Sequence, residues 1–309
     1  MASFGEEVLS ALPTEARNEK TMRLDELSTL EMLTVMNAED ALVAAAVQAA
    51  LPEIAAAVDA IAARFALGGR LFYVGAGTSG RLGVLDASEC PPTFSVDAGL
   101  FVGVIAGGDG ALRRSSEGSE DSVAEGRAVL KEHGLRAQDT VCGIAASGRT
   151  PFVLGALARA AECGALTLAL TCAGGARERS RMAQAAAISI ELATGPEVLT
   201  GSTRLKAGTA TKLVLNMIST GVMVRQGAVF SNLMVNVQTT NVKLVNRAER
   251  ILAAATGCNA RRAAELLRVG GSVKVGIVME MVEVGREEAE LLLTEQAGNL
   301  RLVLLAAGK

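Results

Sequence analysis

Glycine-rich loops with hydroxyl side chains give the clearest indication of chemistry in this 309-residue sequence. The first spans residues 75–81 (GAGTSGR) and follows the apolar run 71–74, a pattern that predicts a turn from a buried strand into a helix. The free backbone N–H groups of such a turn bind anions, and Gly77, Thr78 and Ser79 lie in it. The loop is therefore a candidate anion site.

Two further loops share this design. Residues 145–150 (AASGRT) follow the apolar run 141–144, and residues 200–203 (TGST) precede a long helical pattern, with Lys206 one turn inside it. Strand-to-helix turns emerge at one edge of a parallel sheet, so we expect the first two loops to share one crevice. Hydroxyls, backbone amides and one or two cations that converge there predict a site for a phosphate monoester.

A dinucleotide is the main alternative ligand. The glycines of the first loop match the dinucleotide-binding fingerprint, and Asp97 lies near the distance expected of a ribose contact. However, the hydroxyls of Thr78 and Ser79 lie where a pyrophosphate loop uses bare backbone. They favour a sugar phosphate over NAD by about three to one. Simple tight turns would explain one such loop but hardly three.

Two acidic positions are candidate acids and bases. Glu89 lies near the end of the helix that starts at the first loop, just before Pro91 and Pro92. A carboxylate near a phosphate is electrostatically unfavourable, so a chemical task is one explanation for it and an exposed surface glutamate is the other. Glu120 lies in the acidic cluster 117–121 at the start of a helix, where acids also simply complement the helix dipole. Both follow strands of the expected sheet and can reach the crevice.

Histidine and cysteine chemistry is largely excluded. His133 is the only histidine and lies at a predicted helix C-terminus, which leaves no Ser-His-Asp or Cys-His relay. The five cysteines show no paired ligand spacing, so we expect buried free thiols and no metal site. Proton transfers in any reaction must then come from carboxylates, lysine or tyrosine.

The composition is that of a globular protein. The 30 basic residues nearly balance the 33 acidic ones and aromatic residues make up only 3%, which argues against nucleic acid and anionic membrane surfaces as partners. Residues 1–7 lack the pattern of a signal peptide, and no long stretch is free of charged and polar residues. We therefore expect a cytoplasmic location.

Strand-like and helical patterns alternate through the middle of the chain. The apolar runs are 70–75, 100–106, 140–146, 165–171 and 186–192. This alternation predicts an α/β fold, a parallel sheet with helices on both faces. Upstream, Ser28 and Glu31 have the spacing of a capping box, and residues 41–67 predict two helices or one kinked helix.

Downstream of the sheet the patterns are helical. Helices are expected at 205–225, 232–255, 260–268, 273–283, 285–294 and 298–307, the last four short enough for a compact bundle. We expect three parts: an N-terminal helical extension (1–50), a sheet domain that binds the sugar phosphate (51–235), and a linker helix with a small helical domain (236–309).

Taken together, the motifs resemble, over nearly the whole chain, the N-acetylmuramic acid 6-phosphate etherases, bacterial members of the sugar isomerase (SIS) superfamily. The segments that carry the resemblance are 75–81 with 85–94, 117–121, 143–151 and 200–209. The resemblance implies an SIS-type sheet, a small ubiquitin-associated-like helical module at the C-terminus, and a homodimer with the site near the subunit interface. It also implies cleavage of the lactyl ether of N-acetylmuramic acid 6-phosphate, which gives N-acetylglucosamine 6-phosphate and D-lactate in cell-wall sugar recycling.

This chemistry assigns roles to the candidate residues. Once the sugar ring opens, the proton on carbon 2 is acidic and the ether at carbon 3 leaves by elimination, which needs one base, one acid and a phosphate anchor but no metal or redox cofactor. By resemblance, Glu89 protonates the departing lactate and then activates water, and Glu120 removes the carbon 2 proton. The phosphate contacts implied by resemblance are Ser79, Ser147, Gly148 and Thr150, with Ser202 and Lys206 as further contacts.

The sequence departs from the family pattern at a few positions. Ser95 and Ser231 stand where the family leads us to expect glycine, Asn236 where we expect aspartate, and residues 173–175 replace an Asn-Pro-Gly turn. These departures affect local loop geometry and possible dimer contacts, and neither glutamate.

Two other classes of protein remain open at this point. A non-catalytic sugar-phosphate sensor, like the glucokinase regulatory protein or SIS-domain transcription factors, could keep the loops and dispense with the two glutamates. An SIS isomerase would be expected to pair a carboxylate with histidine or lysine, and His133 lies outside every loop.

Overall fold

The computed structural model describes residues 13–114, 118–176, 178–239 and 241–309. The chain divides into two compact units, which we call the sheet unit (residues 1–88 and 99–218) and the helical unit (residues 89–98 and 219–309). Each is described by itself. The predictions for residues 1–7 and for Glu117 concern residues outside the described part of the chain.

The sheet unit contains the five parallel strands that the apolar runs predict. They are β1 (Leu71–Gly75), β2 (Phe101–Ile105), β3 (Thr140–Ile144), β4 (Leu166–Thr171) and β5 (Ile188–Glu191), in the order β2-β1-β3-β4-β5. Gly75 at the end of β1 is level with Ile144 at the end of β3. The turns that follow these two neighbouring strands therefore leave the sheet at the same edge.

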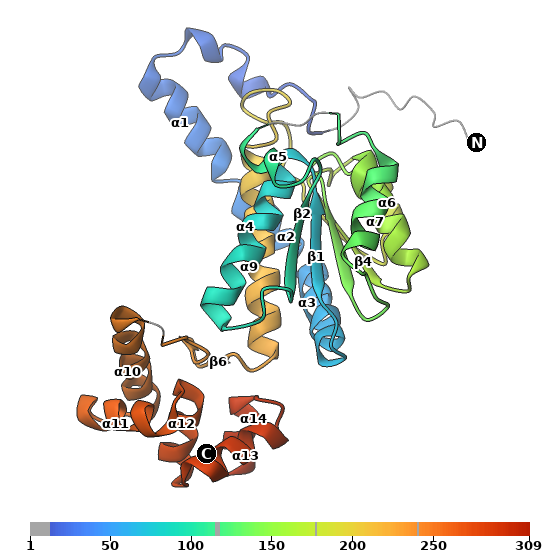
Figure 1. The fold of residues 1–309 in the computed structure, drawn as a ribbon. Helices are drawn as coiled ribbons and strands as arrows, with labels where there is room; N and C mark the ends of the chain where they lie inside the picture. The colour runs from blue at the N-terminus through green and yellow to red at the C-terminus, as the bar shows by residue number, and fades with distance from the viewer. Residues whose placement is uncertain (1–12, 115–117, 177, 240) are drawn as a thin grey trace. The chain divides into compact units, whose positions relative to one another are not determined.

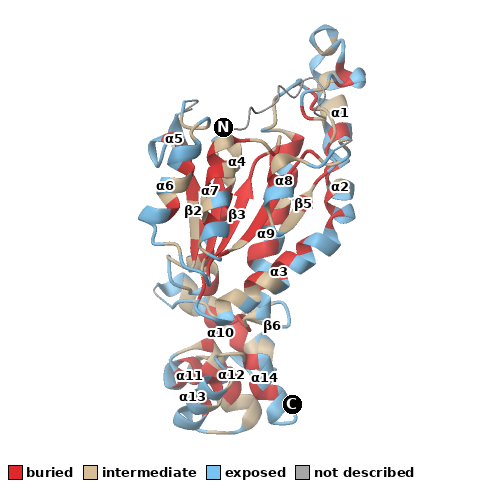
Figure 2. Cartoon of the chain, turned by 90° about the vertical axis from the view of Figure 1, so that its right-hand side faces the viewer, coloured by how far each residue is buried: buried red, intermediate tan, exposed pale blue. Residues whose placement is uncertain are grey.

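Helices cover both faces of this sheet, as expected of parallel strands (Figure 1). On one face, α6 (Val123–Glu132) and α7 (Pro151–Glu162) pack against a cluster that includes Phe72 and Val74 of β1. On the other lie α3 (Leu51–Ala66) and the first parts of α4 (Gly77–Phe94) and α9 (Lys206–Arg225). Both β1 and β3 are buried along their whole length (Figure 2), which explains their continuous apolar sequences.

The smaller elements of this unit are short helices. They are η2 (Glu19–Thr21), η3 (Leu24–Glu26), α1 (Thr29–Asp40), α2 (Val43–Ala49), α5 (Gly110–Arg113) and α8 (Arg181–Ala185). The capping box at the start of α1 is confirmed, since the backbone N–H of Ser28 donates to Glu31 and that of Glu31 donates to the Ser28 hydroxyl. The segment 41–67 forms two helices, and Pro52 lies in the first turn of the second.

Within the described residues, no single helix has the length and hydropathy needed to cross a membrane. The helical runs Thr29–Ala49 and Leu51–Ala66 meet those criteria only as a pair, and the pair is bent by 58°.

The helical unit is built around one apolar cluster. A hairpin of β6 (Val229–Phe230) and β7 (Leu233–Met234) precedes α10 (Val242–Thr256), α11 (Ala260–Gly270), α12 (Val273–Val282), α13 (Arg286–Glu295) and α14 (Leu300–Ala306). The expected helix over 232–255 is wrong at its start, because Ser231 adopts φ +54° and turns the chain into the hairpin. The four short helices after Gly257 are confirmed.

Candidate active site

The first glycine-rich loop joins β1 to α4. The strand ends at Gly75 and the helix begins at Gly77, so only Ala76 separates them. Thr78 and Ser79 occupy the first turn of α4, and both side chains are partly exposed. Backbone N–H groups in a first helical turn have no partner within the helix and favour anions, so this turn has the predicted character.

The second loop joins β3 to α7. Gly148 adopts φ +67°, and a Cβ there would lie 2.4 Å from the Cβ of Ser180, so no other residue fits this turn without a rearrangement. Gly148 is buried and determines the conformation of the loop. Ser147, at the tip of the loop, is partly exposed. Helix α7 then begins at Pro151, where proline lacks only an N–H that the helix does not use.

Both loops open into one cavity of about 260 Å³. Its lining residues come from the two loops, from the turn before α6, from the loop before α9 and from the N-terminal segment: Glu15, Ala76, Gly77, Thr78, Ser79, Glu120, Ala145, Ala146, Ser147, Thr150 and Thr203. The structure thus brings together six of the residues singled out from the sequence, and it adds Glu15 and Thr203.

Glu120 is held in this cavity by the second loop. The Thr150 hydroxyl donates a hydrogen bond of 3.0 Å to Glu120 Oε1, and the backbone N–H of Phe152 donates to the Glu120 carbonyl at 3.0 Å. Helices α6 and α7 approach so closely that a Cβ on Gly126 would lie 1.9 Å from the Phe152 carbonyl oxygen. The carboxylate is therefore fixed against the loop, and Thr150, predicted as a phosphate contact, orients it.

The third loop differs from its prediction. Lys206 is buried, and its Nζ lies 2.7 Å from Glu39 Oε2. The backbone N–H groups of Lys206 and Ala207 each donate to a carboxylate oxygen of buried Glu197, at 2.9 Å. The first N–H groups of α9 and the Lys206 side chain are therefore paired within the protein, and the phosphate contact expected of Lys206 stays a prediction. From this loop it is Thr203, in place of the predicted Ser202, that lines the cavity.

Glu39 is the centre of a buried polar network. It accepts hydrogen bonds from Asn18 Nδ2 (2.9 Å), Lys20 Nζ (2.8 Å) and Lys206 Nζ (2.7 Å). Burial alone would raise the pKa of this carboxyl. The hydrogen bonds from Lys20, Lys206 and Asn18 outweigh burial and lower the pKa to about 2. This network ties the N-terminal segment to the start of α9.

Glu89 is exposed on α4, ten residues after Ser79. Glu89 belongs to the helical unit, and it does not line the cavity. Of the two predicted catalytic carboxylates, Glu120 alone lines it. The catalytic role of Glu89 stays a prediction.

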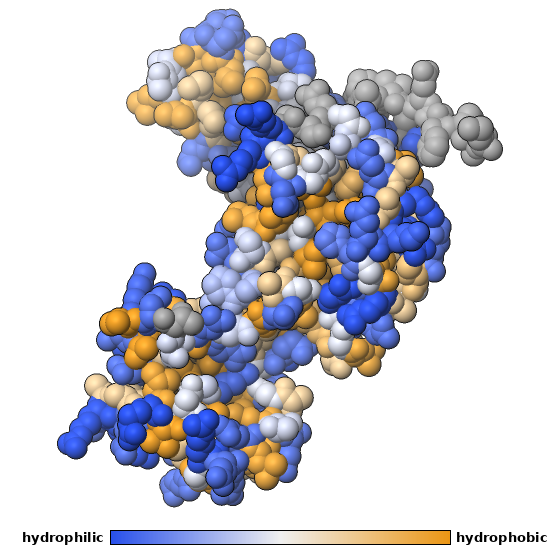
Figure 3. Space-filling model, in the orientation of Figure 1, coloured by the Kyte–Doolittle hydropathy of each residue, from blue (hydrophilic) through white to orange (hydrophobic). Residues whose placement is uncertain are grey.

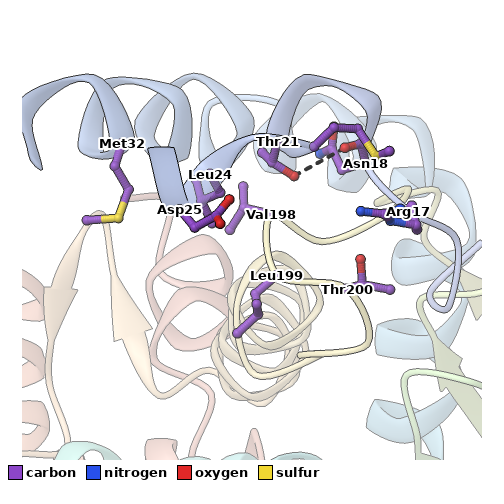
Figure 4. Close-up of a pocket in the computed structure, with 10 residues that line it drawn as sticks. Arg17, Asn18, Thr21, Leu24, Asp25, Met32, Val198, Leu199 and Thr200 are labelled. Carbon is purple, nitrogen blue, oxygen red and sulfur yellow. Dashed lines mark hydrogen bonds between the residues drawn. The ribbon is translucent and has the colours of Figure 1, made fainter. Parts of the chain in front are cut away.

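Glu15 is the residue that sequence reasoning missed. It lies in a polar segment without a recognisable motif, and no local pattern marks its long-range approach to the loop before α9. Glu15 Oε2 is 3.2 Å from the point that a Cβ on Gly201 would occupy. A second cavity of about 410 Å³ lies next to this segment, between Arg17, Asn18 and Thr21 on one side and Val198, Leu199 and Thr200 on the other (Figure 4).

Two solved structures are similar to parts of the chain at low sequence identity. A phosphoheptose isomerase from Francisella tularensis is 16% identical with a TM-score of 0.43 and covers 63% of this chain and 98% of its own. The sugar isomerase domain of an RpiR transcription factor from Sphaerobacter thermophilus is 20% identical with a TM-score of 0.42 and covers 63% of this chain and 93% of its own.

Sequence relatives are much closer. The family model described as glucokinase regulatory protein N-terminal SIS domain matches residues 53–161. The N-acetylmuramic acid 6-phosphate etherase of Pectobacterium atrosepticum is 54% identical over 96% of this chain and 97% of its own length. Those of Clostridium beijerinckii and Serratia proteamaculans are 52% and 53% identical over 96% of this chain and 96% and 99% of their own. The chain belongs to the N-acetylmuramic acid 6-phosphate etherase family.

Proposed function

We propose that this protein cleaves the D-lactyl ether of N-acetylmuramic acid 6-phosphate and releases N-acetylglucosamine 6-phosphate and D-lactate. One observation carries the proposal beyond family membership. The carboxylate of Glu120, fixed by Thr150, shares a cavity of about 260 Å³ with two loops suited to a phosphate. A base beside a phosphate anchor is what elimination from a phosphosugar requires.

The phosphate binds at the first two loops. The backbone N–H groups at the start of α4 and the hydroxyls of Thr78, Ser79 and Ser147 are available to its oxygens. Thr203 adds a hydroxyl from the loop before α9. The phosphate thereby fixes one end of the substrate and leaves the sugar carbons to extend toward Glu120.

Glu120 acts on the open-chain aldehyde. It takes the proton from carbon 2, the electron pair of that C–H bond forms the carbon 2 to carbon 3 double bond, and the carbon 3 to oxygen bond breaks. The lactate oxygen takes a proton from an acid as it departs. Water then adds to carbon 3 and a proton returns to carbon 2, so the sequence is balanced without an oxidant or a reductant.

The acid in this sequence is Glu89 of a second copy. Glu89 of the same chain does not line the cavity that holds Glu120. A homodimer with its sites near the interface, which the family resemblance implies, would supply the partner's Glu89 to each cavity. This arrangement, like the cytoplasmic location expected from the sequence, is part of the proposal.

Mixed dimers test the shared site. We expect Glu89→Gln and Glu120→Gln homodimers each to be inactive. Coexpression of the two chains gives heterodimers in which one site holds both substitutions and the other holds neither, so about half of the wild-type activity per heterodimer returns. No recovery in purified heterodimers would show that each cavity uses its own Glu89.

D-lactate release tests the function itself. Purified protein is mixed with N-acetylmuramic acid 6-phosphate, and D-lactate is measured with a coupled dehydrogenase. We expect stoichiometric release that Glu120→Gln abolishes and that Glu19→Gln, an exposed carboxylate outside the cavity, leaves unchanged. Binding of the phosphosugar without lactate release by wild-type protein would favour the sensor alternative.

A further inference from the structure

The segment that carries Glu15 is anchored in the sheet unit by buried polar groups. We call residues 13–27 the strap. Its Thr14 and Asn18 are buried, and Asn18 Nδ2 donates to Glu39 at 2.9 Å and to the Pro196 carbonyl at 3.4 Å. Figure 4 shows Arg17 and Asn18 of the strap lying above the loop that leads into α9. A buried polar group without its partner is costly, so the two bonds of Asn18 hold the strap beside Glu39 and Pro196.

Glu39 provides a second connection between the strap and the start of α9. Lys20 of the strap and Lys206 of α9 both donate to its carboxylate, at 2.8 and 2.7 Å. Helix α9 starts shortly after the loop that contains Gly201 and Thr203, and Glu15 Oε2 lies 3.2 Å from the point that a Cβ on Gly201 would occupy. The exposed carboxylate of Glu15 therefore lies beside this loop, three residues before the buried anchor Asn18.

Two carboxylates consequently line a cavity suited to a phosphosugar. Each additional negative charge weakens phosphate binding, so a second carboxylate needs a task that Glu120 does not perform. The elimination reaction provides such a task. It requires an open-chain aldehyde, and a cyclic sugar reaches that form only when a proton moves from the anomeric oxygen O1 to the ring oxygen O5.

We propose that Glu15 opens the sugar ring, an inference that rests on the proposed etherase function. Its carboxylate takes the proton from the O1 hydroxyl as the carbon 1 to O1 bond becomes a double bond. The carbon 1 to O5 bond breaks with its electron pair going to O5, and Glu15 returns the proton to O5. The step is balanced, and Glu15 ends as a carboxylate ready for the next substrate. Glu120 is left free for the proton on carbon 2.

Anomer interconversion of N-acetylglucosamine 6-phosphate isolates this step, because this sugar opens and closes its ring without losing lactate. Exchange between its α and β anomers is measured by NMR exchange spectroscopy with and without enzyme. We expect wild-type protein to accelerate the exchange and Glu15→Gln to lose that acceleration by about 100-fold, the usual contribution of a general acid and base. Glu120→Gln should retain anomer exchange and lose hydrogen exchange at carbon 2.

Controls separate catalysis from folding and from the etherase proposal. Glu15→Asp should recover part of the anomer exchange, Glu19→Gln on the same strap should behave as wild type, and all variants should bind the phosphosugar and unfold at the wild-type temperature. Wild-type anomer exchange in Glu15→Gln, or a loss explained by weaker binding or unfolding, would overturn the inference. Absence of D-lactate release from wild-type protein would instead overturn the etherase function.

Discussion

The loops before α7 and α9 have similar sequences and both reach the cavity, but the helices that follow them start in different surroundings. Both place small hydroxyl residues ahead of a helix, and both were predicted to contact phosphate. Before α7, the Thr150 hydroxyl donates to the catalytic candidate Glu120 and Ser147 faces the cavity. Before α9, the carboxylate of Glu197 takes the first N–H groups of the helix, and Glu39 pairs with Lys206. What pairs with the start of a helix therefore depends on residues outside the loop and not on the composition of the loop alone.

Figure 3 shows hydrophilic and hydrophobic side chains interspersed over the face that it presents. The two loops differ in what lies beside them inside the sheet unit. A buried ion pair lies at the start of α9, whereas Ser147 and Thr150 before α7 line the cavity with Glu120. Substitutions can test each side of this distinction.

The largest expected effect is on the catalytic side. Glu120→Gln should lower D-lactate release by about 1000-fold, because the carbon 2 proton loses its base while the amide still accepts a hydrogen bond from Thr150. The Michaelis constant should change little. Steady-state kinetics with N-acetylmuramic acid 6-phosphate measures both, and a raised Michaelis constant with an unchanged turnover number would assign Glu120 to binding.

On the structural side, Lys206→Met should destabilise the protein by about 3–5 kcal/mol, because it leaves Glu39 buried with less compensating charge. Denaturant unfolding gives the free energy. The matched control is Lys20→Met, which removes the other lysine on Glu39. The Lys20 side chain is 68% exposed, so the loss there should stay below about 1 kcal/mol. Equal losses of unfolding free energy in the two variants would contradict the claim that Lys206 is the main counter-charge of Glu39.

The same network predicts an acid dependence of stability. Burial acts to raise the pKa of Glu39, but the hydrogen bonds from Lys20, Lys206 and Asn18 together outweigh it and lower the pKa from 4.5 to about 2. A depressed carboxyl pKa stabilises the folded state above the unfolded pKa, and this stability is lost as pH falls from about 4.5 through about 2. The contribution is about 3 kcal/mol.

Unfolding free energies of wild-type protein and Glu39→Gln between pH 7 and pH 2 test this dependence. The difference between them should shrink across the acid range and be smallest near pH 2. A difference that stays constant with pH would show that Glu39 contributes packing and not charge.

The smallest expected effect compares the two loops directly. Ser147→Ala should raise the Michaelis constant for the phosphosugar about tenfold, the value of one hydrogen bond to a charged group. Ser202→Ala, the corresponding change in the loop before α9, should change it less than about twofold. If both serines have the same effect, Ser202 contacts the phosphate as well as Thr203.

Local sequence signals predicted most of the fold. Buried parallel strands leave continuous apolar runs, and Ser28 with Glu31 or Gly257 marks helix ends through short-range bonds. The hairpin at β6 and β7 was not predicted, because Ser231 takes a left-handed conformation that residues other than glycine rarely adopt.

The residues of the candidate site also fall into two groups, those marked by a local sequence pattern and those placed by long-range contacts. The first two loops and Glu120 were predictable because each follows a strand or precedes a helix whose position is set by local pattern. The pairing of Lys206 with Glu39 joins residues 167 positions apart, and the place of Glu15 depends on the buried anchor Asn18. Neither has a local signature, so only the folded chain reveals them.

Elimination at this cavity is the central claim, and solvent deuterium tests it most directly. The wild-type enzyme is given N-acetylmuramic acid 6-phosphate in deuterated water, and both products are analysed by NMR and mass spectrometry. Removal of the carbon 2 proton before the ether breaks predicts N-acetylglucosamine 6-phosphate with deuterium at carbon 2 and D-lactate with no carbon-bound deuterium. A product that keeps its original hydrogen at carbon 2 would contradict the account.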